Sequence, residues 1–172
     1  MGVLCKIKSI VPKSVLVTLY YSLIYSHLSY CNIVWGNASS HYIDKLHVMQ
    51  KKAVRIITNS DFRDHTPPLF SQLQILQIQD IFKYQLGNFM YKYSNQLLPD
   101  IFHDYFSLNS NVHNYPTRNY ACIHIPKSNT LSYSKSVLFS GATLWNSLPN
   151  TLKFCSSFRT FTKCFKSHLL SN

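Results

Sequence analysis

A long stretch without any Lys, Arg, Asp or Glu, residues 14–43, constrains the fold more than any other feature of this chain. It is long enough to cross a bilayer, which takes about 20 apolar residues. However, Ser, Asn and His side chains are scattered through it, and its tyrosines lie in its middle and not in two interfacial belts. The stretch is therefore expected to form a buried helix of a folded protein, and no membrane is expected as a partner.

Apolar residues in this stretch recur at steps of three and four, which predicts one long helix over residues 12–35. Pro12 suits the first turn of a helix, and Gly36 followed by Asn37 is a typical stop. The stripe is wide, so this helix is expected to be buried on more than one side. Its members are Leu16, Leu19, Tyr20, Leu23, Ile24, His27, Leu28 and Cys31.

A second helix is predicted over residues 40–58, with Ser40 as its candidate cap. Its expected inner face consists of Ile43, Leu46, Met49, Gln50, Val54 and Ile57. Four basic residues lie mostly elsewhere on it and make it the most cationic segment of the chain: Lys45, Lys51, Lys52 and Arg55. The pair Pro67–Pro68 marks the break that follows.

The remaining periodicity predicts helices over 69–73, 77–94, 133–147 and from Ser156 or Ser157 onward, with a short turn after Pro99. The last helix is expected to bury Phe158, Phe161, Cys164, Phe165 and Leu169, and to expose Arg159, Lys163 and Lys166. Residues 107–119 are rich in Asn and Ser and read as a loop, and 120–125 alternate weakly, as in a short strand. The expected fold is therefore mainly α, with one candidate short β element.

The charge balance favours a polyanionic partner, either nucleic acid or an anionic membrane face. There are 17 Lys and Arg against 6 acidic residues, none of them Glu, and the formal net charge is +11. The phosphate-contact candidates are Lys45, Lys51, Lys52, Arg55 and Arg63. Charge alone leaves open whether they contact phosphate or form a solvated helix face.

No catalytic set is visible in the sequence. The six Asp are scattered, and the two closest, Asp61 and Asp64, suit loop capping better than metal binding. There is no grouped glycine for a phosphate loop, no nucleophile elbow and no HExxH. The five cysteines form no CxxC pair, which indicates reduced thiols, an intracellular location in cytoplasm or nucleus, and no metal site or cofactor.

Two strings in the first half carry a family resemblance. Residues 19–36 read LYYSLIYSHLSYCNIVWG, and residues 45–58 read KLHVMQKKAVRIIT. Both resemble the C-terminal part of reverse transcriptases from jockey-like non-LTR retrotransposons, in which a Leu-Tyr, Tyr-Cys and Trp-Gly helix precedes a Gln-Lys-Lys-Ala helix. The matching residues include Leu19, Tyr20, Tyr30, Cys31, Trp35, Gly36, Gln50, Lys51, Lys52 and Ala53.

Later strings agree with this family in the same order. HNYPTR, with His113, Tyr115 and Arg118, looks like its His-x-Tyr-x-Thr-Arg signature. GATLWNSLP, with Trp145, Asn146 and Pro149, looks like its Gly-x-x-x-Trp-Asn-x-Leu-Pro signature. Nearly the whole chain is covered, including a closing helix SFRTFTKCFKSHLL. All these motif residues, like Tyr30, Trp35 and Gly36, are expected to have structural roles.

The resemblance implies a function as well as a fold. Residues 1–60 look like the thumb that grips the template–primer duplex, and 61–172 like the post-thumb region, with an internal boundary at 107–119. The fingers, the palm and the catalytic Asp pair that holds Mg²⁺ in the family have no counterpart here. The expected partners are RNA, DNA or both through phosphate contacts, together with a palm domain or a second copy of the chain.

Two other functions stay open. A helical interaction module would bind a protein partner through an apolar groove and would not need nucleic acid. A small basic membrane-associated protein would use residues 14–43.

Overall fold

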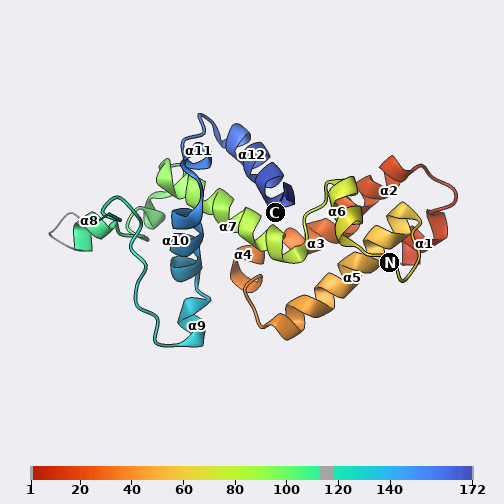
Figure 1. The fold of residues 1–172 in the computed structure, drawn as a ribbon, viewed down its shortest axis with the longest axis horizontal. Helices are drawn as coiled ribbons and strands as arrows, with labels where there is room; N and C mark the ends of the chain where they lie inside the picture. Colours follow the sequence, from red (N-terminus) through yellow and green to blue (C-terminus); the bar gives the residue numbers. More distant parts are fainter. Residues whose placement is uncertain (1, 113–117, 172) are drawn as a thin grey trace. The chain divides into compact units, whose positions relative to one another are not determined.

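The computed structural model of the protein describes residues 2–112 and 118–171, and it is mainly helical (Figure 1). The expected mainly α fold is thereby confirmed. The helices fall into two compact units, Met1–Phe82 with Leu169–Asn172, and Lys83–His168. The boundary between the two compact units thus lies after residue 82, within a helix. The division into thumb and post-thumb regions at residue 60 stays a prediction.

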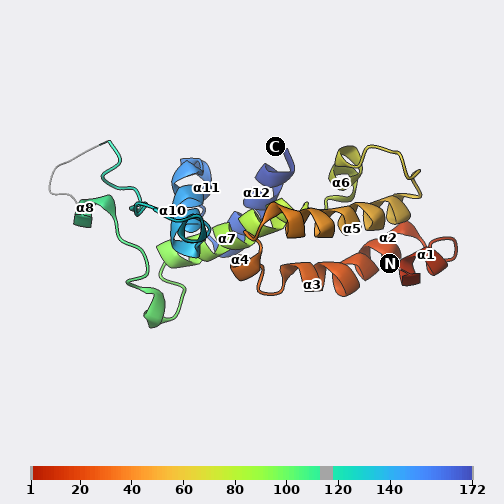
Figure 2. The same ribbon diagram turned by 90° about the horizontal axis from the view of Figure 1, so that it is seen from below.

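The first unit is built around two neighbouring helical stretches. Its elements are α1 (Gly2–Ile7), α2 (Lys13–Tyr20), the π-helical turn η1 (Tyr21–Tyr25), α3 (Ser26–Ser29), α4 (Asn32–Trp35), α5 (Ser40–Thr58), α6 (Pro67–Leu73) and the start of α7 (Ile78–Ser94). Figure 2 shows α5 beside the continuous run from α2 to α3. The short helix α1 was not expected from the sequence.

The expected single helix over 12–35 is wrong, because the chain breaks at Tyr30 and Cys31. Cys31 adopts a left-handed conformation with φ 48°, which a helix cannot contain. Side chains satisfy the carbonyls that the break leaves free: Asn32 Nδ2 donates to Leu28 O at 2.9 Å, and Trp35 Nε1 donates to Tyr30 O at 2.8 Å. The break is therefore a built feature of the fold.

The turn η1 changes which residues of this run are buried. Leu16, Tyr20, Leu28 and Asn32 are buried, and they are spaced by four residues or a multiple of four. An α-helix drifts by about 40° over four residues, and a π turn inserts the extra residue that corrects this drift. Two expected stripe members, Leu23 and His27, are consequently exposed, and a third, Cys31, is exposed at the helix break itself.

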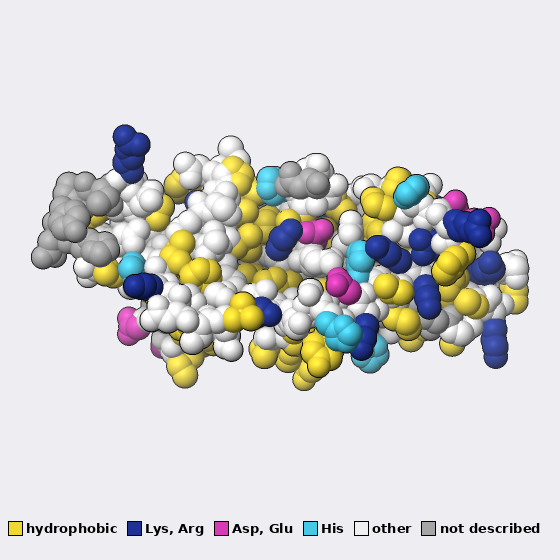
Figure 3. All heavy atoms as spheres, turned by 60° about the horizontal axis from the view of Figure 1, so that its bottom comes forward, with side chains coloured by type: hydrophobic (Ala, Val, Ile, Leu, Met, Phe, Trp, Pro, Cys, Tyr) yellow, Lys and Arg dark blue, Asp and Glu magenta, His cyan; other side chains and the backbone are white. Residues whose placement is uncertain are grey.

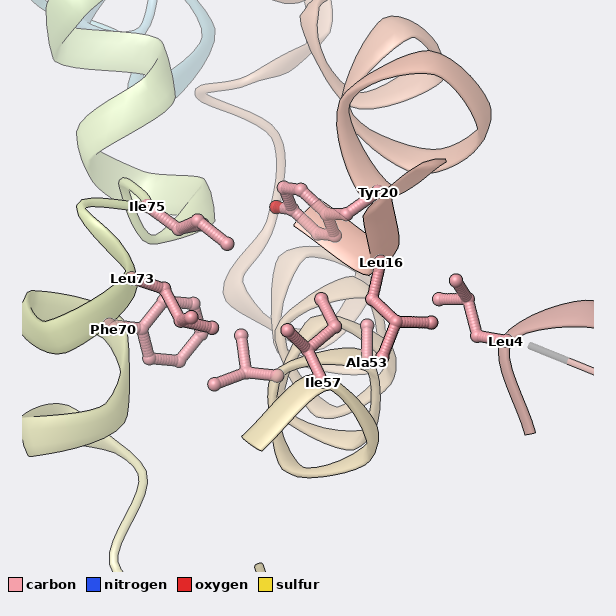
Figure 4. Packing of buried hydrophobic residues seen from close by; sticks show 9 residues of the cluster. Leu4, Leu16, Tyr20, Ala53, Ile57, Phe70, Leu73 and Ile75 are labelled. Atoms are coloured by element: carbon pink, nitrogen blue, oxygen red, sulfur yellow. The ribbon is translucent and has the colours of Figure 1, made fainter. Parts of the chain in front are cut away.

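The core of the first unit joins four of its helices, as Figure 4 shows. It consists of Leu4, Leu16, Tyr20, Ala53, Val54, Ile57, Phe70, Leu73 and Ile75. One buried polar side chain crosses this region: Gln50 Nε2 donates to Tyr20 Oη and to Leu76 O, both at 2.8 Å. The residues predicted for the inner face of α5 are buried or partly buried, with the exception of Met49, which is 48% exposed. His47, which was not predicted for this face, is partly buried.

The second unit has an aromatic core. After α7 its elements are η2 (Asp100–Phe102), α8 (Asn109–Val112), α9 (Leu131–Ser134), α10 (Val137–Ser147), α11 (Asn150–Lys153) and α12 (Phe158–Ser171). Phe161 stacks on Tyr91 at 4.4 Å between ring centroids and on Phe165 at 5.3 Å. Phe165 lies against Gly87 so closely that a Cβ there would have no room. The expected burial of Cys164 is wrong, because this side chain is exposed.

Two boundaries in this unit differ from expectation. The helix expected over 133–147 is split in two, because Ser136 Oγ accepts from Phe139 N at 3.3 Å and starts a new helix. The strand expected at 120–125 is absent from the described residues, which contain a single antiparallel bridge between Leu108 and Ile123. The start of the last helix is confirmed, because Ser157 Oγ accepts from Thr160 N at 3.1 Å.

Candidate nucleic-acid interface

The outer face of α5 carries the first two phosphate-contact candidates. Lys45 and Lys52 are exposed, and both lie on the side of the helix opposite to buried Gln50 and Val54. Being seven residues apart, they are separated by about 10 Å along the helix axis. Lys45 Nζ also lies 5.9 Å from the centre of the Tyr42 ring, which is itself exposed. This face therefore offers two solvent-accessible ammonium groups, of which Lys45 lies next to an aromatic ring.

The C-terminal end of α5 adds Arg55 and Arg63. Arg55 Nε and Nη2 donate to Asp64 O at 3.3 and 2.9 Å, and its guanidinium lies 5.7 Å from the centre of the Phe62 ring. These contacts hold the loop in which exposed Arg63 lies between Phe62 and Asp64. A guanidinium has five N–H donors, so Arg55 keeps donors for a phosphate after making these bonds.

Lys8 joins the same end of α5, although no pattern in the sequence selects it. Its Nζ donates to Asn59 Oδ1 at 3.1 Å, although the two residues are 51 positions apart. Asn59 is the left-handed residue that ends α5, with φ 54°. A cation is favourable at this place, since the carbonyl end of a helix dipole is negative. No periodicity or motif in residues 2–10 could have indicated the contact.

Lys51 differs from the other candidates on α5. It is half-buried and lies toward the edge of the helix that carries His47, not on the outer face. Burial lowers the pKa of His47, and Lys51 acts in the same direction, whereas Asp44 and Asp80 raise it. The His47 ring stacks on Phe70 at 6.1 Å with an interplanar angle of 10°. Lys51 thus belongs to the surroundings of a packed histidine.

The lowered pKa of His47 predicts a pH-dependent stability. Below the ordinary value of 6.5 the unfolded chain takes up a proton that the folded protein resists, so the free energy of unfolding should fall as the pH drops from about 7 to about 5. The full stability is present above 6.5. Urea denaturation at several pH values should show a weaker pH dependence in His47→Gln than in the unchanged protein. His41→Gln, at an exposed position of the same helix, should keep the dependence; an unchanged slope in His47→Gln would contradict the assignment.

Asp61 and Asp64 have the loop-capping role that the sequence favoured. Asp64 Oδ2 accepts from Asp61 N at 2.7 Å, and Asp61 Oδ1 accepts from Phe62 N at 2.9 Å. Within the described residues, no group of three or more His, Cys, Asp or Glu side chains is placed to hold a metal ion. These two carboxylates therefore shape the loop that presents Arg63.

Two of the three motif residues of the first unit, Trp35 and Gly36, have a packing or bonding role in the fold. Gly36 is needed for space, because a Cβ there would lie 2.6 Å from Asn32 O and 2.7 Å from Phe82 Cδ2. Trp35 closes the helix break through its indole N–H. Tyr30, by contrast, exposes 76% of its surface and supplies only its carbonyl to that bond.

The motif residues of the second unit hold its loops. Trp145 is buried beside Phe161, and Pro149 separates α10 from α11. Asn146 pairs with the backbone of Ile123 on both sides: its Oδ1 accepts from the N–H at 3.1 Å and its Nδ2 donates to the carbonyl at 2.8 Å. Arg118 is exposed. His113 and Tyr115 lie outside the described residues.

Basic side chains are interleaved with hydrophobic ones on the first unit. Figure 3 shows Lys and Arg gathered over the part of the molecule that holds α1 and α5. A mixture of cations and exposed rings is typical of surfaces that bind phosphate backbones and unpaired bases. Among the helices of residues 2–112 and 118–171, none combines the length and the apolar character that a membrane crossing requires.

Comparison with known proteins adds no relative. No family model matches the chain, and no curated protein and no solved structure is significantly similar to it.

Proposed function

We propose that this chain is the thumb and post-thumb region of a jockey-like retrotransposon reverse transcriptase and that the outer face of α5 grips the backbone of a template–primer duplex. The chain itself has no catalytic role in this proposal. The observation that carries it is the pair of exposed lysines, Lys45 and Lys52, on the face of α5 opposite to the core. The motif strings described above supply the family.

The mechanism of this grip is electrostatic. A duplex carries one phosphate charge per about 1.7 Å of its axis, so a helix laid along it meets several phosphates over the length of α5. Lys45 and Lys52 would each neutralise one phosphate, and Arg55, Arg63 and Lys8 would extend the contact at the end of the helix. Contacts to phosphates fix position without reading sequence, so little base specificity is expected.

The test is a titration of an RNA–DNA hybrid duplex at several salt concentrations with the variant Lys45→Gln/Lys52→Gln. Two lost phosphate contacts should weaken binding at low salt by at least about tenfold and reduce the slope of log affinity against log salt by about 1.8. Fluorescence anisotropy of a labelled hybrid measures both quantities. These two lysines are preferred to Lys51 and Arg55, because those side chains are packed or engaged in bonds within the fold.

The matched control is Lys6→Gln/Lys13→Gln, which removes the same charge from exposed positions of the same unit. It should reduce affinity by no more than about twofold if contacts and not net charge dominate. Equal losses in both variants would indicate a diffuse charge effect. A folded protein that binds no hybrid at low salt would refute the proposal.

A second candidate function, a helical protein-interaction module, is favoured by one observation. Tyr30 and Val34 are 76% and 82% exposed on either side of the helix break at Cys31. Exposed apolar residues that lie close together are typical of surfaces that another protein covers. Light scattering after size-exclusion chromatography, without nucleic acid, tests self-association, and Tyr30→Ser/Val34→Ser should abolish it. A monomer at all concentrations would remove the self-association form of this candidate.

A further inference from the structure

The second unit carries a basic helix face of its own. Arg159 and Lys163 are exposed on α12, one turn apart, and Lys166 follows at the next turn. The opposite side of α12 carries Phe161 and Phe165, which are fully buried. The helix is thus amphipathic, with its cationic side directed to solvent.

Acidic residues are scarce in the sequence of this unit. Between Lys83 and His168 the sequence contains two of them, Asp100 and Asp104, and none is in α12. Asp100 lies 3.8 Å from His103 in its own turn. A further cation is placed at the start of α12, where Lys92 Nζ lies 4.6 Å from the centre of the Phe158 ring. The unit thus has a clear excess of basic over acidic residues, which favours a polyanionic ligand.

An exposed aromatic ring precedes this face. Phe154, in the turn between α11 and α12, is 82% exposed. The turn is fixed on both sides of it, because Leu152 is buried and Tyr91 Oη donates to Cys155 O at 2.8 Å. Five residues of chain span at most about 18 Å, so Phe154 lies within reach of the same ligand as Arg159. A phenylalanine ring that stays exposed to solvent buries little apolar surface, so it contributes little to the stability of the fold.

We infer that Phe154 with Arg159 and Lys163 forms a second nucleic-acid-binding surface whose ligand is single-stranded. The two cations would contact successive phosphates, since they are about 6 Å apart along the helix. Phe154 would stack on an unpaired base, which a duplex does not offer because its bases are already stacked. This inference rests on the proposed function only in taking nucleic acid as the partner; the surface and the strand state are independent of α5.

The experiment measures binding of the whole chain to a labelled oligothymidylate, which forms no duplex, and in parallel to the RNA–DNA hybrid. Arg159→Gln/Lys163→Gln should weaken oligothymidylate binding by about tenfold and reduce the salt slope by about 1.4, the value for two single-strand phosphates. Phe154→Leu should weaken it by about tenfold with no change in salt slope, because stacking releases no counterions. Binding of the hybrid should change by less than about twofold in both.

Arg118→Gln/Lys127→Gln is the matched control, since it removes one Arg and one Lys from exposed positions of the same unit. A loss of oligothymidylate binding in this control equal to that in Arg159→Gln/Lys163→Gln would overturn the inference, as would an unchanged affinity in the latter. So would a failure of the unchanged protein to bind oligothymidylate. The Lys45→Gln/Lys52→Gln variant separates the two proposals: if it leaves hybrid binding intact, the role of α5 fails while the α12 surface stands on the oligothymidylate data.

Discussion

Replacing Phe161 by alanine is expected to lower the free energy of unfolding by about 3–5 kcal/mol. This ring is fully buried and contacts three other aromatic rings, those of Tyr91, Phe165 and Trp145. Its removal leaves a cavity where α7, α10 and α12 meet, and the remaining rings are too rigid to fill it. Urea denaturation followed by far-ultraviolet circular dichroism measures the change.

Phe154→Ala is the matched control for this prediction, because it removes the same side chain from an exposed position in the same unit. It should change the free energy of unfolding by less than about 0.5 kcal/mol. Similar destabilisation by both substitutions would mean that Phe161 does not lie at the centre of the aromatic core.

Gln50→Leu is expected to destabilise the first unit by about 2–4 kcal/mol, although the two side chains have similar volumes. Gln50 is the donor to both Leu76 O and Tyr20 Oη, and leucine would leave these buried groups without it. Burial raises the pKa of Tyr20, whereas the hydrogen bond from Gln50 acts in the opposite direction, so Tyr20 stays a neutral, buried hydroxyl that needs a hydrogen-bond partner. Thermal and urea denaturation measure the loss.

A double-mutant cycle identifies the mechanism of this loss. Adding Tyr20→Phe to Gln50→Leu removes one of the two deprived groups, so the double variant should be less destabilised than the sum of the single ones. Gln79→Leu, at an exposed position of α7, should be nearly neutral. Additive effects in the cycle would show that the Gln50–Tyr20 bond contributes little.

Helices whose pattern follows a uniform period were predictable from the sequence. The span of α5 was expected as 40–58, and α7 and α12 began within one or two residues of their predicted starts. Periodicity reports the buried face of a regular helix, and α5 and α12 each have one such face. The exposure of the candidate cations Lys45 and Lys52 was predictable for the same reason, because they lie off the buried face of α5.

Features that the apolar period of a helix does not encode were not predictable. Cys31 is neither Gly nor Asn, the residues that usually adopt a left-handed conformation, and the side-chain bonds of Asn32 and Trp35 hold the break. The π turn at Tyr21–Tyr25 shifts the apolar residues after it around the helix. Leu23 is therefore exposed, although the regular helical spacing predicted that it is buried. The approach of Lys8 to Asn59 has no local signal at all.

The turn η1 also limits how the length of this segment can vary. A π turn is equivalent to one residue inserted into an α-helix, so deleting one residue within Tyr21–Tyr25 would restore a regular helix. Such a deletion would rotate everything after it by about 100° relative to Leu16 and Tyr20. Leu28 and Asn32 would then leave the core, and insertion of a further residue would displace them in the other direction. The length of this segment is consequently as constrained as the buried side chains on either side of it.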